Sequence, residues 1–191
     1  MPLSKEHKQK SKEKILQSAV QLFTHKGFNK VSIDEVMQHA GMTRGAFYAH
    51  FDSKESLYSE AILAGTFNSL IYQHKNAGTL EEVPLFDIIS VYLSKDHLKR
   101  KSSPCMLAFM ATDVANEEKQ VRQTYTKVFE GFIRVIEETS GNSNINTENA
   151  MAIAAMMIGS IAVGRALSND KLAFQLLESS KEMAGFVLDN Y

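Results

Sequence analysis

The sequence predicts an all-α protein. Apolar residues recur at helical spacing along most of the 191 residues, and only three prolines interrupt the chain. Asn-Gly and Asp-Gly turns are absent, and no sustained alternation of β-branched residues indicates a sheet. The chain is 44% hydrophobic and 23% charged, which is typical of a globular protein one to two domains long.

Apolar stripes and capping residues predict about nine helices. The first carries an apolar stripe from residue 15 to 23 and ends at Lys26-Gly27. Ser32 can cap a second helix over 33–40, with Glu35 three residues later completing a capping box. After a tight turn, Thr43 can cap a third short helix that runs to about residue 50. Six mostly longer helices are expected at about 54–75, 83–98, 103–115, 120–139, 147–167 and 171–189.

Charge is distributed unevenly along the chain. Residues 1–54 hold nine lysines and arginines against five acids, a net charge of +4, and the remainder carries −5. Four of the six histidines also lie in the first segment. A basic end on an otherwise acidic chain favours a polyanionic partner for that end. A solvated, lysine-rich first helix would give the same balance.

Two short helices joined by a tight turn in this basic segment fit a helix-turn-helix. In that motif the second helix enters the major groove of DNA. Arg44 has the shape to span guanine O6 and N7, and Tyr48, His50 and Lys54 are suitable phosphate partners. A helical adaptor that binds no DNA is one alternative, but it leaves the arrangement of these four side chains unexplained.

Part of this segment resembles a known family. The residues Phe47-Tyr48-x-His50-Phe51-x-Ser53-Lys54-Glu55 are similar to the N-terminal DNA-binding domain of TetR-type (TetR/AcrR) repressors, and the likeness covers about residues 12–60. The other two-thirds resembles the family in helix count, with a weaker local likeness to one subgroup at 105–115. The resemblance implies a nine-helix fold with a three-helix helix-turn-helix domain over 1–53. A ligand-binding and dimerisation domain would follow over 54–191.

The same resemblance implies roles for single residues and for partners. The residues implied to face base edges are Thr43, Arg44, Gly45 and Ala49. Those implied to hold phosphates are Ser32, Tyr48, His50 and Lys54, whereas Ile33, Phe47 and Phe51 are implied to be core. The implied partners are a palindromic double-stranded DNA operator, a second copy of the chain docked mainly through the last two helices, and a small ligand that relieves repression.

Methionines and aromatic residues gather in the C-terminal part. Because methionine side chains adapt to varied shapes, they favour a malleable pocket for a hydrophobic or amphipathic ligand, although ordinary core packing uses the same residue types. The candidate lining residues are Phe67, Phe86, Cys105, Met106, Phe109, Met110, Tyr125, Phe129 and Met156. The many small residues over 150–164 predict close helix packing, in a four-helix bundle with a partner or at the centre of a monomer.

The single cysteine, Cys105, suggests an alternative function. It follows Ser103-Pro104 near a predicted helix N-terminus, with three cations at 99–101 just before it. The helix dipole and these cations would lower the pKa of the thiol, as in a repressor that senses electrophiles or oxidants. A small buried hydrophobe is the competing interpretation of a lone cysteine.

No catalytic or metal-binding motif stands out in the sequence. It contains no Gly-x-Ser-x-Gly, no phosphate-cradling glycine loop, no His-Glu-x-x-His and no Cys-x-x-Cys, and a predicted helix break separates His97 from Cys105. We therefore predict a non-enzyme with no cofactor and no metal. The start of the chain has no apolar export signal, and the longest uncharged apolar run, 150–164, is shorter than the ~20 residues of a membrane helix. We expect a cytoplasmic protein without membrane contact.

Overall fold

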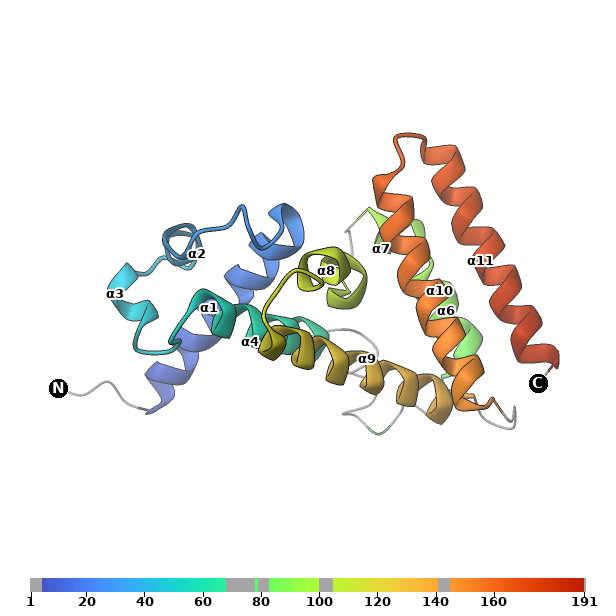
Figure 1. The fold of residues 1–191 in the computed structure, drawn as a ribbon, viewed down its shortest axis with the longest axis horizontal. Coiled ribbons are helices and arrows are strands. Elements are labelled where there is room, and N and C mark those ends of the chain that lie inside the picture. The colour runs from blue at the N-terminus through green and yellow to red at the C-terminus, as the bar shows by residue number, and fades with distance from the viewer. Residues whose placement is uncertain (1–4, 68–77, 79–82, 100–104, 141–144, 191) are drawn as a thin grey trace.

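The computed structural model describes residues 5–67, 78, 83–99, 105–140 and 145–190. Within these ranges it contains ten helices and no strand, which confirms the all-α prediction. The helices are α1 Lys5–Lys26, α2 Ile33–His39, α3 Arg44–Phe47, α4 Lys54–Phe67, α6 Leu85–Tyr92, α7 Lys95–Leu98, α8 Met106–Val114, α9 Lys119–Thr139, α10 Thr147–Ala166 and α11 Asp170–Asn190. Figure 1 shows α2 and α3 at one end, α10 and α11 at the other, and α4, α8 and α9 between them.

Local sequence signals end and start the first helices. Gly27, with φ +81°, ends α1 in the left-handed region, and Gly41, with φ +69°, makes the turn after α2. Ser32 caps α2, because its Oγ accepts a hydrogen bond from the Glu35 N–H at 3.1 Å. The Glu35 carboxylate pairs with Lys26 on α1 instead of returning to the cap. The predicted capping box is therefore half formed.

Two predicted helices differ from those in the structure. α3 ends at Phe47, and turns replace the predicted helix over 48–50. The helix predicted over 83–98 is two helices, since Ser94 Oγ accepts the His97 N–H at 3.1 Å and starts α7. This split adds one helix to the predicted number. The end of the fourth predicted helix and Ser103-Pro104, at the predicted start of the helix over 103–115, lie outside the described residues.

Aromatic side chains join α1, the turn after it and α4. The rings of Phe23 and Tyr58 meet edge to face at 4.9 Å between centroids, and those of Phe28 and Tyr58 lie 4.6 Å apart. All three side chains are buried. Phe47 and Phe51 are buried too, with ring centroids 5.6 Å apart, and fasten α3 to this core as the sequence predicts.

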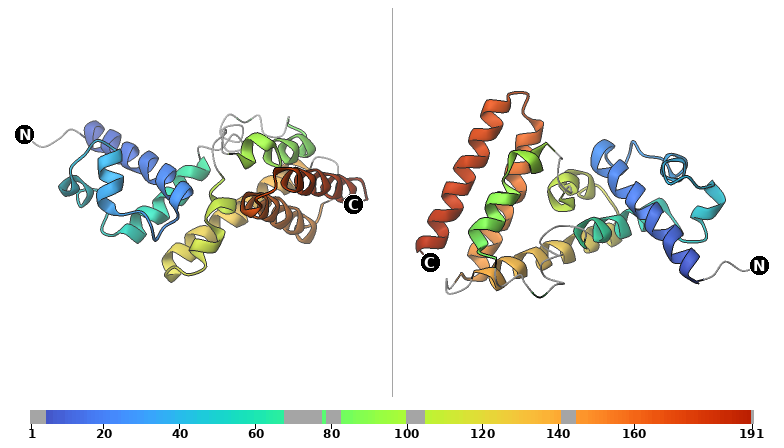
Figure 2. Two further views of the ribbon diagram at one scale, coloured as in Figure 1. Left: turned by 90° about the horizontal axis from the view of Figure 1, so that it is seen from above. Right: turned by 180° about the vertical axis from the view of Figure 1, so that it is seen from behind.

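α10 is the central helix of the C-terminal part. By length and composition it is apolar enough to cross a membrane, with a mean hydropathy of 1.4. In the fold it packs against α7, α8, α9 and α11, and it buries Ile153, Met157 and Ile161 (Figure 2). Its opposite face exposes Met151 and Val163. The apolar run is thus a core helix on one side and an open apolar surface on the other.

α8 connects the C-terminal core to the turn after α1. Asp113, near its C-terminal end, accepts the backbone N–H of Phe28 through Oδ2 at 3.0 Å. Gly27 comes so close that an added Cβ would lie 2.8 Å from the same oxygen. At the other end, Met106 packs directly on Gly65 of α4. Any displacement of α8 along its axis must therefore disturb the turn that precedes α2.

We expect Asp113→Ala to lower the free energy of unfolding by about 1–3 kcal/mol, because a partly buried N–H loses its acceptor. Asp113→Asn keeps a side-chain oxygen and should retain most of that stability. Urea unfolding measures the stability, and amide exchange of Phe28 reports on the hydrogen bond itself. Native-like values of both in Asp113→Ala would show that the contact contributes nothing.

Candidate nucleic-acid interface and ligand site

The α2–turn–α3 unit exposes most of the predicted base-facing and phosphate-holding side chains together. The exposed residues of α3 and its flanks are Thr43, Arg44, Gly45, Tyr48 and Ala49. Tyr48 is an aromatic residue at 57% exposure, whereas its neighbour Phe47 is fully buried beneath it. The buried Phe47 anchors α3, and Tyr48 next to it projects from the exposed face of the helix into solvent.

Arg44 forms an ion pair with Asp34, from Nη1 to Oδ2 at 2.7 Å. Tyr48, and after it Asp34, raise the pKa of the Arg44 guanidinium. Both partners of the ion pair are mostly exposed, so solvent screens the pair and its contribution to stability is small. A base edge can therefore replace Asp34 at little cost. Sequence reasoning missed Asp34, because its partner lies ten residues away across a turn.

The hydroxyl groups of Ser32 and Thr43, both predicted to contact DNA, differ in the hydrogen bonds that they already make within the protein. Ser32 is exposed, but its Oγ already accepts the Glu35 N–H. Thr43 stands at the N-cap position of α3 without a side-chain capping bond. Its hydroxyl is therefore free of the helix and lies beside Arg44 on the exposed face.

Lys54 is turned inward. Its Nζ donates to the Phe28 carbonyl oxygen at 2.6 Å and lies 4.0 Å from the centroid of the Phe28 ring. Burial lowers the pKa of its ammonium. The Phe28 carbonyl oxygen takes one of the three N–H groups of the Lys54 ammonium. The predicted contact of Lys54 with a phosphate would therefore use the other two. Lys54 also fastens the turn after α1, a structural role the sequence did not indicate.

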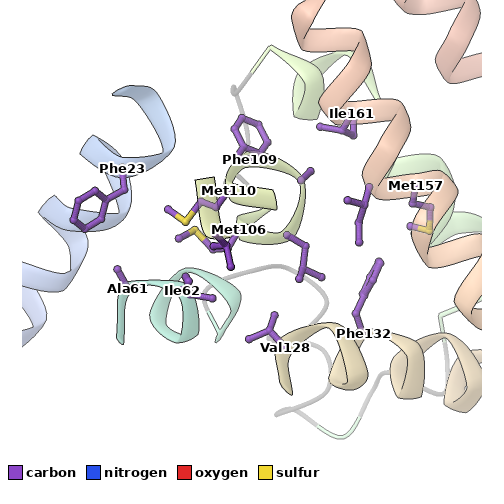
Figure 3. Close-up of a cluster of buried hydrophobic side chains, with 14 of the residues drawn as sticks. Phe23, Ala61, Ile62, Met106, Phe109, Met110, Val128, Phe132, Met157 and Ile161 are labelled. Carbon is purple, nitrogen blue, oxygen red and sulfur yellow. The ribbon is translucent and has the colours of Figure 1, made fainter. Parts of the chain in front are cut away.

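Most of the candidate ligand residues are buried or partly buried in the core. Met106 and Met110 are buried in the core between α4, α8 and α9, as Figure 3 shows. Phe109 is also buried, and the Cζ atom of the Arg165 guanidinium lies 3.7 Å from the centroid of its ring. The partly buried candidates packed against the same core are Tyr125, Phe129 and Met156. A ligand at this place must displace methionine side chains, which are the most adaptable ones in a core.

One ligand candidate lies at the surface, apart from the buried candidates. Phe86 is 44% exposed on α6 and lies against Gly185 of α11, away from Met106. The helical period of α6 turns Leu85, Ile88 and Ile89 inward instead. The side chain of Phe67 lies outside the described part of the structure.

Cys105 belongs to a compact polar cluster. The Tyr92 hydroxyl donates to its Sγ at 3.1 Å, and its own N–H donates to His97 Nε2 at 3.3 Å. His97 Nδ1 meets the Tyr92 carbonyl oxygen at 2.6 Å and so carries the ring proton. The imidazole thus binds the backbone N–H of Cys105, and the group that contacts the thiol is the Tyr92 hydroxyl, which is a hydrogen-bond donor and not a base.

The predicted low pKa of this thiol is wrong. Cys105 does occupy the N-cap position of α8, but burial raises its pKa. The Tyr92 hydrogen bond and two backbone N–H groups act in the opposite direction and do not compensate. Desolvation therefore outweighs the helix terminus, and a half-buried packing residue describes Cys105 better than a reactive thiolate.

The helical fold and the exposed face of α3 define a helix-turn-helix DNA-binding protein. A family model described as "Bacterial regulatory proteins, tetR family" matches residues 15–61. The regulator YfiR of Bacillus subtilis, an uncharacterized HTH-type protein, is 28% identical over 71% of this chain and 68% of its own length. The negative regulator IcaR of the Staphylococcus aureus biofilm operon icaADBC is 25% identical over 43% of this chain and 45% of its own.

Solved structures share the fold along nearly the whole chain. Reduced Escherichia coli NemR matches with a TM-score of 0.73 at 19% identity, over 92% of this chain and 95% of its own. A regulatory protein TetR from Rhodobacter sphaeroides matches with a TM-score of 0.70 at 17% identity, over 91% and 96%. Residues 15–61 thus match the DNA-binding segment of the TetR family, and the chain as a whole shares the fold of TetR-family structures, which supports a DNA-binding transcriptional regulator.

His97 should make stability depend on pH. Burial lowers its pKa, against a smaller opposite effect of the Tyr92 carbonyl, so the folded protein keeps the ring neutral. Below about pH 6.5 the unfolded chain binds a proton that the folded one does not, and the free energy of unfolding falls. Urea unfolding at pH 7.5 and 5 should show a smaller decrease in His97→Gln than in the native protein. Equal decreases would mean that His97 does not titrate in this way, since His50 is present in both.

Proposed function

We propose that the protein is a repressor that binds a palindromic operator as a homodimer and leaves it when a small apolar ligand binds. The exposed, anchored face of α3 carries this proposal, because it presents a guanidinium and a phenol on a basic domain. The repressor role also agrees with IcaR, a negative regulator. Such a protein acts on the chromosome, so we infer a soluble cytoplasmic protein.

Individual residues have distinct proposed roles at the operator. Arg44 reads a base edge, with Thr43 beside it, while Gly45 and Ala49 let the helix approach the groove closely. The proposed phosphate partners are Ser32, Tyr48, His50 and Lys54. Base contacts specify the sequence and phosphate contacts position the protein, so the two sets should respond differently to mutation.

Unpartnered apolar side chains on α10 and α11 support a dimer. The exposed large hydrophobic residues of these helices are Met151, Val163, Leu172, Met183 and Phe186, all between 46 and 60% exposed. Leu172, Met183 and Phe186 share one face of α11 by helical spacing, and a large exposed apolar face often marks an interaction surface. A second copy would cover it through a two-fold four-helix bundle.

The contacts of α8 support release by a ligand. Its first turn contributes Met106 and Phe109 to the proposed pocket, and its last turn holds Phe28 of the DNA-binding domain through Asp113. A ligand that displaces the methionines would therefore move the turn before α2. FadR from Bacillus subtilis, which shares the fold with a TM-score of 0.61 at 14% identity over 93% of this chain and 98% of its own, is known in complex with stearoyl-CoA. This supports a long apolar ligand as the first class to test.

Selection of bound DNA from a random pool should yield a short palindrome. We expect Arg44→Ala to lower affinity for it about 10- to 100-fold and to relax the preference at one base pair of each half-site. Lys54→Ala should weaken all sequences alike. A pool without any enriched sequence, or native binding by Arg44→Ala, would refute the role of α3. Compounds that release the selected DNA then identify the ligand class.

A charge in the apolar face of α11 should dissociate the dimer. Phe186→Glu places a carboxylate where the partner would bury a ring, which costs several kcal/mol unless the chains separate. Sedimentation at micromolar concentration should give a dimer for the native protein and a monomer for the variant. Leu63→Glu, at an exposed apolar position of α4, is the control that should stay dimeric. A monomeric native protein would contradict the two-fold arrangement.

A further inference from the structure

A basic groove lies between the start of α1 and the residues that follow α3. Its volume is about 270 Å³, and its lining residues are Lys5, Lys8, Gln9, Lys12, Ala49 and His50. Two of these residues follow α3, and four come from the start of α1. Figure 1 shows the N-terminal end of α1 at the same end of the molecule as α3.

The α1 residues of the groove share one helix face. Positions 5, 8, 9 and 12 follow the spacing i, i+3, i+4, i+7, which places them in one row along two turns. Glu6 pairs with Lys10 at 2.6 Å, away from this row. The groove therefore gathers three of the six lysines of α1 and leaves the first acid of the helix on another side.

Two of the three groove lysines are available to an anion. Lys12 is already paired with Glu60 of α4 at 2.6 Å. Lys5 and Lys8 form no ion pair with any residue that the structure describes, and both are exposed. An anion in the groove would thus meet two uncompensated ammonium groups.

His50 adds a nitrogen that lacks a partner. Its Nδ1 is buried and makes no hydrogen bond among the described residues. Burial, and after it the charges of Lys8 and Lys12, lower the pKa of the ring, so it is neutral at neutral pH. A neutral imidazole can still donate one N–H to an oxygen anion, and an anion would relieve the repulsion between the lysines.

We propose that this groove binds a backbone phosphate of the operator, held by Lys5 and Lys8 together with His50. The inference rests on the proposed operator binding and extends it to α1. DNA supplies the phosphate because Ala49 and His50 line the groove at the end of the unit that enters the major groove. The contact adds Lys5 and Lys8 of α1 to the phosphate proposed for His50, and so extends the operator contacts of each protomer to the start of α1.

The salt dependence of operator binding tests the groove. One lost phosphate contact per protomer removes two per dimer, which reduces the slope of log affinity against log salt by about 1.8. At 0.15 M salt, Lys8→Gln should therefore bind about 30-fold more weakly than the native protein. Lys10→Gln is the matched control, since it removes the same charge from a lysine that faces Glu6 instead of the groove. The slope of log affinity against log salt should change less than half as much in Lys10→Gln as in Lys8→Gln.

Ethylation interference locates the phosphate. In each half-site, one phosphate should block binding of the native protein when ethylated but have no effect on Lys8→Gln. The proposed phosphate site would be overturned if the two variants had equal slopes, or if Lys8→Gln and the native protein gave identical interference patterns. Either result would leave operator binding itself intact. A native protein that selects no operator at all would overturn the proposed function, and the groove with it.

Discussion

The aromatic cluster of Phe23, Phe28 and Tyr58 is the interaction on which the DNA-binding end depends. α2 has seven residues and α3 has four, far fewer than the ~12–15 that a helix needs to persist alone in water. Both helices must therefore be held by tertiary packing, α2 on α1, and α3 on α2 and the shared core. The cluster fixes α1 against α4, and Phe28 also anchors the turn from which α2 starts. Loss of this core would free the recognition face even if every exposed residue remained.

α8 links the turn that holds Phe28 to the C-terminal part of the chain. It has nine residues, yet its two ends contact different functional regions. Its start is held by the cluster of Tyr92, His97 and Cys105, and its end by the hydrogen bond from Phe28 to Asp113. Because packed interiors shift between discrete arrangements instead of deforming continuously, a short helix held at both ends can transmit a displacement.

The reading face of α3 has few side chains that can distinguish bases. Gly45 and Ala49 are exposed there, and they leave Arg44 and Thr43 as the groups with hydrogen-bonding capacity toward bases. A protein with so few base contacts relies more on backbone contacts and on the shape of the DNA. The basic groove at the start of α1 agrees with that balance, since it adds positive charge without adding sequence information.

Helix positions, the cap at Ser32 and the helix-turn-helix pattern could be predicted from the sequence, because spacing and capping act over a few residues. The exposed set around Arg44 followed from the same local pattern. Tertiary structure decided the rest, since burial and long-range partners depend on which elements meet. It turned Lys54 toward Phe28, exposed Phe86, and joined Asp113 to a residue 85 positions earlier. The pKa of Cys105 shows the reason most directly: its helix terminus is visible in the sequence, but the desolvation that outweighs it arises only when the chain packs around the thiol.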